Sequence, residues 1–324
     1  MRQFQTSLAE RRAGTTIVFL AVIAYFASTP HFFETENLFT LTRQYAEIGI
    51  IAAGMTLVVA TGGIDISVGG TASMTSMLIG LLAVRHGIPI WPACAMAIAC
   101  AGMVGVINGY CIAYLRLQPV LVTLATMSLT RGLAQLVTKT QAISLERFSS
   151  LQALSMNDLA IPGLPIPIPA LILGSVFAGT AVLLRKTVYG RHWLAAGQSE
   201  AAAQLSGLPV KRAKFLAYLI LSLLAGLAGI LVSARTATSF PDAGANYEFE
   251  AITAVVLGGT SLSGGEGSLI GTLVGVATMA ALRNGLSLGG QTDIVRTQML
   301  ALALIAAVII DNIRTRLIRG GQSA

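Results

Sequence analysis

The segment from Thr61 to Gly70 reads "TGGIDISVGG" and interrupts two long apolar stretches with four glycines and one aspartate. In a lipid environment each backbone N–H or C=O that loses its helical partner costs several kcal/mol. A carboxylate in the same place is also expensive. Such an interruption therefore persists only inside a protein bundle or beside a water-filled cavity. We expect a re-entrant turn or helix break, in which Asp65 either caps the next helix together with Ser67 or belongs to a transport pathway.

The composition of the whole chain indicates the environment in which this segment lies. The 324 residues are 54% hydrophobic and only 11% charged, and the mean hydropathy is +0.75. A soluble domain carries about 25% charged residues, so this chain cannot cover a water-facing surface. The apolar runs are continuous and lack the alternation of a membrane β-barrel. The composition indicates an all-α integral membrane protein.

A spanning helix needs about 20 apolar residues, and this length divides the chain into ten candidates. The glycines between the eighth and ninth make these two the least distinct. We therefore expect a polytopic protein of about ten transmembrane helices in a single transmembrane domain over residues 1–324. The candidate spans are 14–29, 43–61, 67–84, 92–114, 119–137, 166–184, 214–234, 248–262, 264–282 and 295–312.

Charge predicts the orientation of these spans. The net charge is +7, and placing the N-terminus inside puts most basic residues in inner loops, as the positive-inside rule requires. Because the basic surplus follows the sides of a membrane, we expect lipid contact and no nucleic-acid partner. Ten spans then place both termini in the cytoplasm.

An internal similarity links the two halves of the chain. "VVATGGIDISVGG" begins at Val58 and "VVLGGTSLSGG" begins at Val255, and Glu47 and Glu250 precede them. Glycine-interrupted segments in corresponding halves of a membrane protein indicate a transport site. We expect a structural repeat of residues 43–137 and 248–312. The candidate pathway or helix-break residues are Gly62, Gly63, Asp65, Ser67, Gly69, Gly70, Asn108, Thr126, Gly258, Gly259, Ser263, Gly264 and Gly265.

Asn108 and Thr126 are included in this set because they are polar residues within apolar spans. Hydrogen bonding between helices explains most residues of this kind. A small-molecule site also needs hydrogen-bonding groups between apolar walls, so a role in lining a transport pathway stays open as well.

Catalytic signatures are missing from the sequence. The chain has no G-x-x-x-x-G-K-[ST] phosphate loop and no H-E-x-x-H motif. Its three histidines are scattered, and its three cysteines match no zinc spacing. We expect no catalytic residue, no metal ligand and no cofactor on this chain.

The polar loop 185–213 contains "SEAAAQLSGLP". This pattern predicts a short cytoplasmic helix that starts at Ser199 as N-cap and stops at Gly207 and Pro209. Such a helix is suited to docking on a partner, and the alternative is an ordinary charged loop. The candidate coupling residues are Ser199, Glu200, Ala201, Ala202, Gly207 and Pro209.

The pieces "GGIDISVGG" (62–70), "AVVLGGTSLSGGEGSLIGTLVGV" (254–276) and "GQSEAAAQLSGLPV" (197–210) resemble the ribose-type membrane permeases of ABC importers, along nearly the whole chain. The "EAA" followed by glycine is similar to the coupling-helix motif of ABC permeases. It departs from that motif by one residue, because four residues separate Ala202 from Gly207 where three are usual.

The resemblance implies a type II ABC importer-like permease in a bacterial inner membrane, without catalytic activity of its own. Two such permeases, identical or paralogous, would form the channel for a monosaccharide such as a pentose, a rhamnose-like sugar or autoinducer-2. A separate ABC ATPase subunit would bind ATP and magnesium and dock on the coupling helix, and a periplasmic sugar-binding protein would deliver the substrate. "PGLPIPIPALI" (162–172) and "GQS" (197–199) look most like the rhamnose and autoinducer-2 permeases.

Two other functions remain as alternatives. A stand-alone secondary carrier or channel would use embedded acids for ion coupling, and Asp65 and Glu47 are the only candidates for that role. A membrane enzyme or a structural subunit would need a catalytic or scaffolding feature that the sequence does not display.

Overall fold

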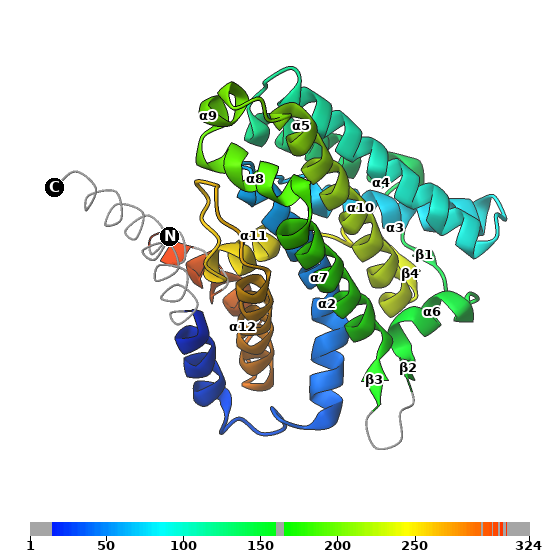
Figure 1. Ribbon diagram of the computed structural model, residues 1–324. Coiled ribbons are helices and arrows are strands. Elements are labelled where there is room, and N and C mark those ends of the chain that lie inside the picture. Colours follow the sequence, from blue (N-terminus) through cyan, green and yellow to red (C-terminus); the bar gives the residue numbers. More distant parts are fainter. Residues whose placement is uncertain are drawn as a thin grey trace.

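The computed structural model describes residues 15–159, 165–292, 294–299, 301–303, 305, 306 and 309, and these are mostly helical (Figure 1). A first helix covers Thr15–Phe26, and residues 294–299 and 301–303 are helical near the C-terminus. The longer helices are α2 (Thr35–Ala60), α3 (Val68–Gly80) with its π-helical extension (Leu81–Arg85), α4 (Ile90–Ala113), α5 (Pro119–Thr138), α7 (Ile168–Lys186), α10 (Val210–Thr236) and α12 (Leu269–Leu288). The shorter elements are α6 (Ser149–Met156), α8 (Val188–Gln198), α9 (Glu200–Leu205), α11 (Tyr247–Leu257), β1 (Ile143–Ser144), β2 (Asp158–Leu159), β3 (Ile166–Pro167) and β4 (Thr238–Ser239).

The core forms around α2, α3 and α10. Helix α2 is buried continuously from Tyr45 to Ala60, and α3 is buried along almost all of its length. Helix α10 packs against α2, α3 and α4. Its 27 residues give it a length of about 40 Å, which is enough to cross a bilayer.

Small residues allow these helices to approach closely. On α4, a Cβ added at Gly105 would lie 2.8 Å from the Cα of Leu219 on α10. On the other side of α10, a Cβ at Gly229 would lie 2.9 Å from the Cβ of Thr75 on α3. Such contacts between small residues are typical of helices that associate within lipid.

The bundle has two ends, which we name after the short helices found there (Figure 1). The α9 end carries α8 and α9. The α6 end carries α6 and the β1–β4 pairing, in which Ile143 lies opposite Ser239. The segment between α5 and α7 thus contains a short helix, α6, and its residues 160–164 lie outside the described part of the chain.

Helix α11 differs from the span predicted at 248–262. It has 11 residues and is about 16 Å long, which is too short to cross a hydrocarbon core of about 30 Å. The loop before it runs back into the bundle beside α3, because the N–H of Gly244 donates to Ser73 Oγ at 3.0 Å. The span predicted at 264–282 also has other bounds, since residues 258–268 form a turn before α12.

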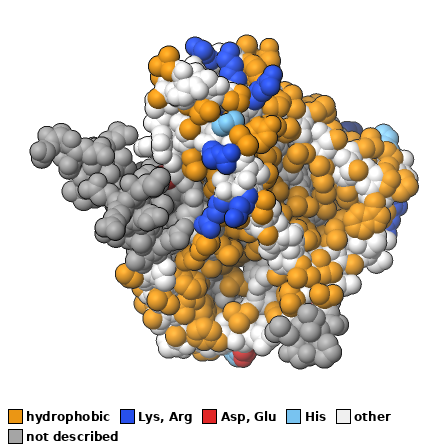
Figure 2. Space-filling view, in the orientation of Figure 1, with side chains coloured by type: hydrophobic (Ala, Val, Ile, Leu, Met, Phe, Trp, Pro, Cys, Tyr) orange, Lys and Arg blue, Asp and Glu red, His pale blue; other side chains and the backbone are white. Residues whose placement is uncertain are grey.

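Within the described residues, five helices are long and apolar enough to cross a membrane. The surface agrees with a membrane location, because hydrophobic side chains cover most of the face in Figure 2 and Lys and Arg gather toward the α9 end. The chain is therefore a multi-pass helical membrane protein. The five helices are Val68–Arg85, Ile90–Ala113, Ile168–Lys186, Val210–Thr236 and Leu269–Leu288.

Candidate functional site

The first break, residues 61–67, is closed by a buried network around Asp65. One carboxylate oxygen, Oδ1, accepts from the backbone N–H of Ser67 at 2.8 Å and from its hydroxyl at 2.6 Å. The amide of Asn108 on α4 donates to Ser67 Oγ at 2.9 Å and reaches Oδ2 at 3.4 Å. Asp65, Ser67 and Asn108 have no exposed surface. Asp65 thus fixes the chain at the entry of α3 and joins it to α4, whereas the N-cap position of α3 belongs to Ser67, without a capping bond from its side chain.

The second turn, residues 258–268, meets the first break at the α9 end. The N–H of Gly265 donates to the carbonyl of Ala60 at 3.0 Å. Gly62, Gly264 and Gly265 all have φ near +80°, a conformation that glycine adopts without steric cost.

A third segment joins this contact. A Cβ added at Gly197, near the end of α8, would overlap the carbonyl oxygen of Ala60 and the N–H of Gly265. We call Gly62, Gly197, Gly264 and Gly265 the glycine junction. It brings both glycine-interrupted segments into backbone contact with the chain immediately before α9.

Helix α9 forms where the sequence predicts a short helix. The hydroxyl of Ser199 accepts from the N–H of Ala202 at 3.2 Å, as an N-cap does. Gly207 has φ +77° after the last turn, and Pro209 follows. Glu200 forms an ion pair with Lys214 on α10 at 2.6 Å, so it holds α9 against its own chain.

Side chains on the outer surface of α9 are exposed. Ala201 and Ala202 are exposed, and Leu205 is 90% exposed. An exposed leucine is ordinary on its own, but here it lies beside two exposed alanines on one six-residue helix. This surface offers apolar contact area at the α9 end.

Other predicted residues lie at tight packing points. A Cβ at Gly63 would overlap the hydroxyl of Tyr218, and one at Gly70 would overlap Thr130 Oγ1. A Cβ at Gly69 would overlap the carboxylate of Glu248, and one at Gly258 would lie 2.5 Å from the backbone of Gly271. Close packing explains why these four positions need glycine. Their role in translocation stays a prediction.

Three of the predicted residues remain to be placed: Thr126, Gly259 and Ser263. Thr126 donates to the carbonyls of Val122 and Thr123 within α5, both at 3.1 Å. Gly259 has φ +84°, and Ser263 is exposed in the second turn.

Three ion pairs join helices inside the bundle. Glu47 on α2 takes two bonds from Arg235 on α10, at 2.7 and 3.1 Å, and a further bond from the hydroxyl of Tyr247. Glu250 on α11 pairs with Arg283 on α12 at 2.7 Å. The third pair joins Arg131 on α5 to Glu248 on α11 at 2.9 Å. The three acids are almost fully buried, so these pairs fix where α11 sits between α2, α5 and α12.

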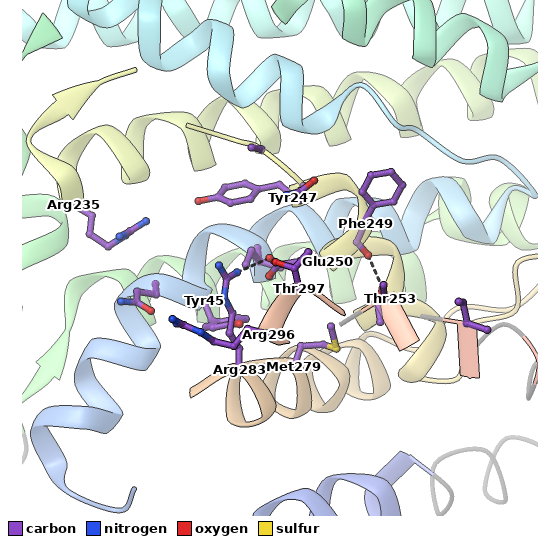
Figure 3. A pocket seen from close by; sticks show the side chains of 16 residues that line it. Tyr45, Arg235, Tyr247, Phe249, Glu250, Thr253, Met279, Arg283, Arg296 and Thr297 are labelled. Atoms are coloured by element: carbon purple, nitrogen blue, oxygen red, sulfur yellow. Dashed lines mark hydrogen bonds and ion pairs between the residues drawn. The ribbon is translucent and has the colours of Figure 1, made fainter. Parts of the chain in front are cut away.

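Two of these pairs border a cavity of about 700 Å³. In Figure 3, side chains from α2, α11, α12 and the C-terminal helical segment converge on it. The residues predicted for the pathway are not among those that line it. The sequence contained one signal for this site, the paired acids Glu47 and Glu250, but no spacing rule connects them to Arg235 and Arg283.

Comparisons with known proteins cover nearly the whole chain. The model of the family described as "Branched-chain amino acid transport system / permease component" matches residues 37–310. The ribose import permease protein RbsC of Escherichia coli K12 is 36% identical over 96% of this chain and 97% of its own length. RbsC of Bacillus subtilis is 39% identical over 91% and 90%, respectively. The L-arabinose ABC transporter permease protein AraH of Azospirillum brasilense is 34% identical over 94% and 88%. No solved structure matches.

Proposed function

We propose that this chain, which belongs to the family of branched-chain amino acid transport system / permease components, is the membrane subunit of an ATP-driven importer of a monosaccharide. The observation that carries the proposal is the near full-length similarity to permeases named for ribose and for L-arabinose. A pentose is the substrate class that these names favour. Rhamnose-like sugars and autoinducer-2 remain predictions from the sequence motifs alone.

The partners follow from the same proposal. A separate ABC ATPase binds ATP and magnesium, and a periplasmic binding protein delivers the sugar. A second permease, either a copy of this chain or a paralogue, completes the channel in the bacterial inner membrane. Import requires that ATP favours one of two arrangements of the channel over the other, because a ligand with equal affinity for both states shifts nothing.

Ten crossings with both termini in the cytoplasm are part of this proposal. The loop 237–246 and α11 together make the eighth crossing, because the loop starts at the α6 end and α11 ends at the α9 end. The α9 end then faces the cytoplasm. The exposed basic residues near it support this orientation through the positive-inside rule; they are Arg185, Lys186, Arg191, Lys211 and Arg212.

Helix α9 is the proposed docking element for the ATPase. Its exposed face, with Leu205 at its C-terminal end, supplies apolar contact, and the glycine junction connects its N-terminal side to both interrupted segments. A movement imposed on α9 therefore reaches the first break and the second turn through backbone contacts.

Uptake in cells tests the function. The chain is expressed with its chromosomal neighbours, one neighbour is deleted at a time, and uptake of labelled D-ribose, L-arabinose, L-rhamnose and autoinducer-2 is measured. Loss of uptake on deletion of an ATPase or a binding protein gene supports the importer and identifies its substrate. Uptake that survives every deletion contradicts it and favours a stand-alone carrier.

A variant tests the docking element. We expect Leu205→Glu to lower co-purification of the ATPase at least about ten-fold, because a charge replaces an apolar contact. The thermal midpoint of the purified permease should not change, since the side chain touches little of its own chain. Gln141→Glu, an exposed position beside β1 at the α6 end, is the control and should retain the ATPase. Equal retention by both variants would refute docking through α9.

A further inference from the structure

We infer that the cavity between α2, α11 and α12 binds the transported sugar, and that Glu250 and Arg283 bind its hydroxyl groups. This inference rests on the proposed function and assigns its substrate site. The volume of about 700 Å³ lies within the range of about 300–1,000 Å³ typical of small-molecule sites. The lining residues are Gln44, Tyr45, Ile48, Arg235, Ala245, Asn246, Tyr247, Phe249, Glu250, Thr253, Met279, Arg283, Arg296, Thr297, Ala301 and Ile305.

The carboxylate of Glu250 is the strongest indication of a ligand. The side chain is 6% exposed, and its Oε1 accepts from Arg283 at 2.7 Å. Its Oε2 is buried without a hydrogen-bond partner in the described part of the chain. A buried acceptor without a partner destabilises the folded state, and more so when it is charged. A hydroxyl group of a bound sugar would donate to this oxygen and remove that cost.

Two ion pairs at the site offer hydrogen bonds to a neutral ligand. Arg283 is balanced by Glu250, and Arg235, another lining residue, is balanced by Glu47. Guanidinium and carboxylate groups in such pairs still offer donors and acceptors to hydroxyls. A third arginine, Arg296, also lines the cavity and donates to Ser287 Oγ at 3.2 Å. The two pairs themselves present many hydrogen-bonding atoms with little net charge, which suits the hydroxyl groups of a polyol.

The walls of the cavity are apolar where the charged pairs are absent. Tyr45, Tyr247 and Phe249 supply aromatic surface, and Met279 on α12 lines the cavity from the side opposite Tyr247 and Phe249 (Figure 3). A monosaccharide has apolar C–H faces between its hydroxyls. Apolar walls with a few convergent polar groups are typical of small-molecule sites.

The backbone around the cavity agrees with this assignment. Helix α11 begins inside the bundle, and three residues of its first turn, Tyr247, Phe249 and Glu250, border the cavity together with the preceding Ala245 and Asn246. In transporters, half-length helices that start near the middle of the bilayer place their N-termini at the substrate site. The observation at Glu250 Oε2 is independent of this geometry.

Transport in proteoliposomes provides the first test. The permease, its ATPase and its binding protein are reconstituted, and ATP-driven uptake of labelled D-ribose, L-arabinose and L-rhamnose is compared between Glu250→Gln and the matched control Glu36→Gln. Glu36 is an exposed residue in the first turn of α2. We expect at least about ten-fold lower uptake for Glu250→Gln, unchanged uptake for Glu36→Gln, and assembly with the ATPase in both.

Cysteine protection provides the second test and does not depend on Glu250. Phe249 is 49% exposed, so Phe249→Cys is placed in a chain whose native cysteines Cys94, Cys100 and Cys111, all on α4, are replaced by alanine. The transported sugar should slow labelling by a thiol reagent at least about five-fold at this position. It should not slow labelling of Leu205→Cys, and ribose 5-phosphate should protect neither.

The outcomes separate the site from the function. If the wild-type complex transports a sugar but Glu250→Gln is unaffected, or if that sugar fails to protect a transporting Phe249→Cys variant, the site assignment is wrong while the importer stands. Protection by ribose 5-phosphate without protection by sugar overturns the neutral ligand. If the wild-type complex shows no ATP-driven uptake of any sugar tested, the proposed function fails first.

Discussion

The two glycine-interrupted segments have similar sequences and are held in different ways. The first break, residues 61–67, lies between two helices that are largely buried, and side chains close it through the hydrogen bonds of Asp65. The second turn, residues 258–268, is longer, and within it the N–H of Ser268 donates to Thr260 Oγ1 at 3.2 Å. Its contact with the first break is made by backbone, through the N–H of Gly265 and the carbonyl of Ala60. Similar patterns of glycine therefore do not imply that two segments are held by the same kinds of contact.

The difference has a consequence for which residues tolerate change. Where side chains close a break, a polar substitution leaves donors or acceptors without partners. Where backbone meets backbone closely, as at Gly197 and Gly264, an added Cβ must displace the chain itself. These two positions of the glycine junction should accordingly be the most sensitive, and the exposed side chains of the second turn the least sensitive.

The largest effect is expected at the glycine junction, for Gly197→Ala. The new Cβ would overlap the backbone of Ala60 and Gly265, and neither can move without opening the junction. We expect a loss of at least about 3 kcal/mol in unfolding free energy, measured by denaturation in detergent. Gly174→Ala on α7 is the control, because a Cβ there meets nothing within 4 Å. Equal stability of the two variants would show that the junction opens easily.

A smaller effect is expected for Asp65→Asn in the first break. The amide would place an N–H₂ group where Oδ1 or Oδ2 now accepts, so at least one buried donor would lose its partner. We expect a destabilisation of about 1–3 kcal/mol, measured in the same way. Ser263→Ala in the second turn should stay within about 0.5 kcal/mol of the wild type. The contrast between side-chain and backbone closure fails if the two changes have equal cost.

A smaller effect than at Gly197 is expected at Gly62, the roomiest position of the glycine junction. Its φ is +78°, and an added Cβ would have 3.7 Å to the nearest atom, the carbonyl oxygen of Ser263. Only backbone strain therefore opposes a Cβ, at about 1–2 kcal/mol for Gly62→Ala. Gly62→Asn should cost less, because asparagine enters the left-handed region more readily. If Gly62→Asn lowers the unfolding free energy as much as Gly197→Ala does, backbone conformation rather than steric contact determines which substitutions the glycine junction tolerates.

Much of the fold follows from local sequence patterns. Hydropathy and length predict the positions of α4, α5, α7 and α10 to within a few residues, and the capping pattern predicts α9. These features depend on neighbouring residues only. Membership of the ribose-type permease group also follows from short motifs, and the comparisons confirm the family.

The rest depends on contacts between distant residues. The sequence could not predict that α11 is half-length, because the returning loop 237–246 is fixed by contacts with α3 such as the bond from Gly244 to Ser73. The ion pairs and the cavity were missed for the same reason. Glu250 and Arg283 lie 33 positions apart, and Glu47 and Arg235 lie 188 apart.

That last separation sets a timescale for the synthesis of the protein. Chains are made at about 5–20 residues per second, so Arg235 follows Glu47 after about 10–40 s. Tyr247, which also donates to Glu47, follows later still. During this interval α2 carries a carboxylate without its native partners, and lipid is a costly place for it. Helix α2 must therefore stay in water or in contact with the insertion machinery during this interval. Its final placement in the bilayer is then a late step in the synthesis and folding of the protein.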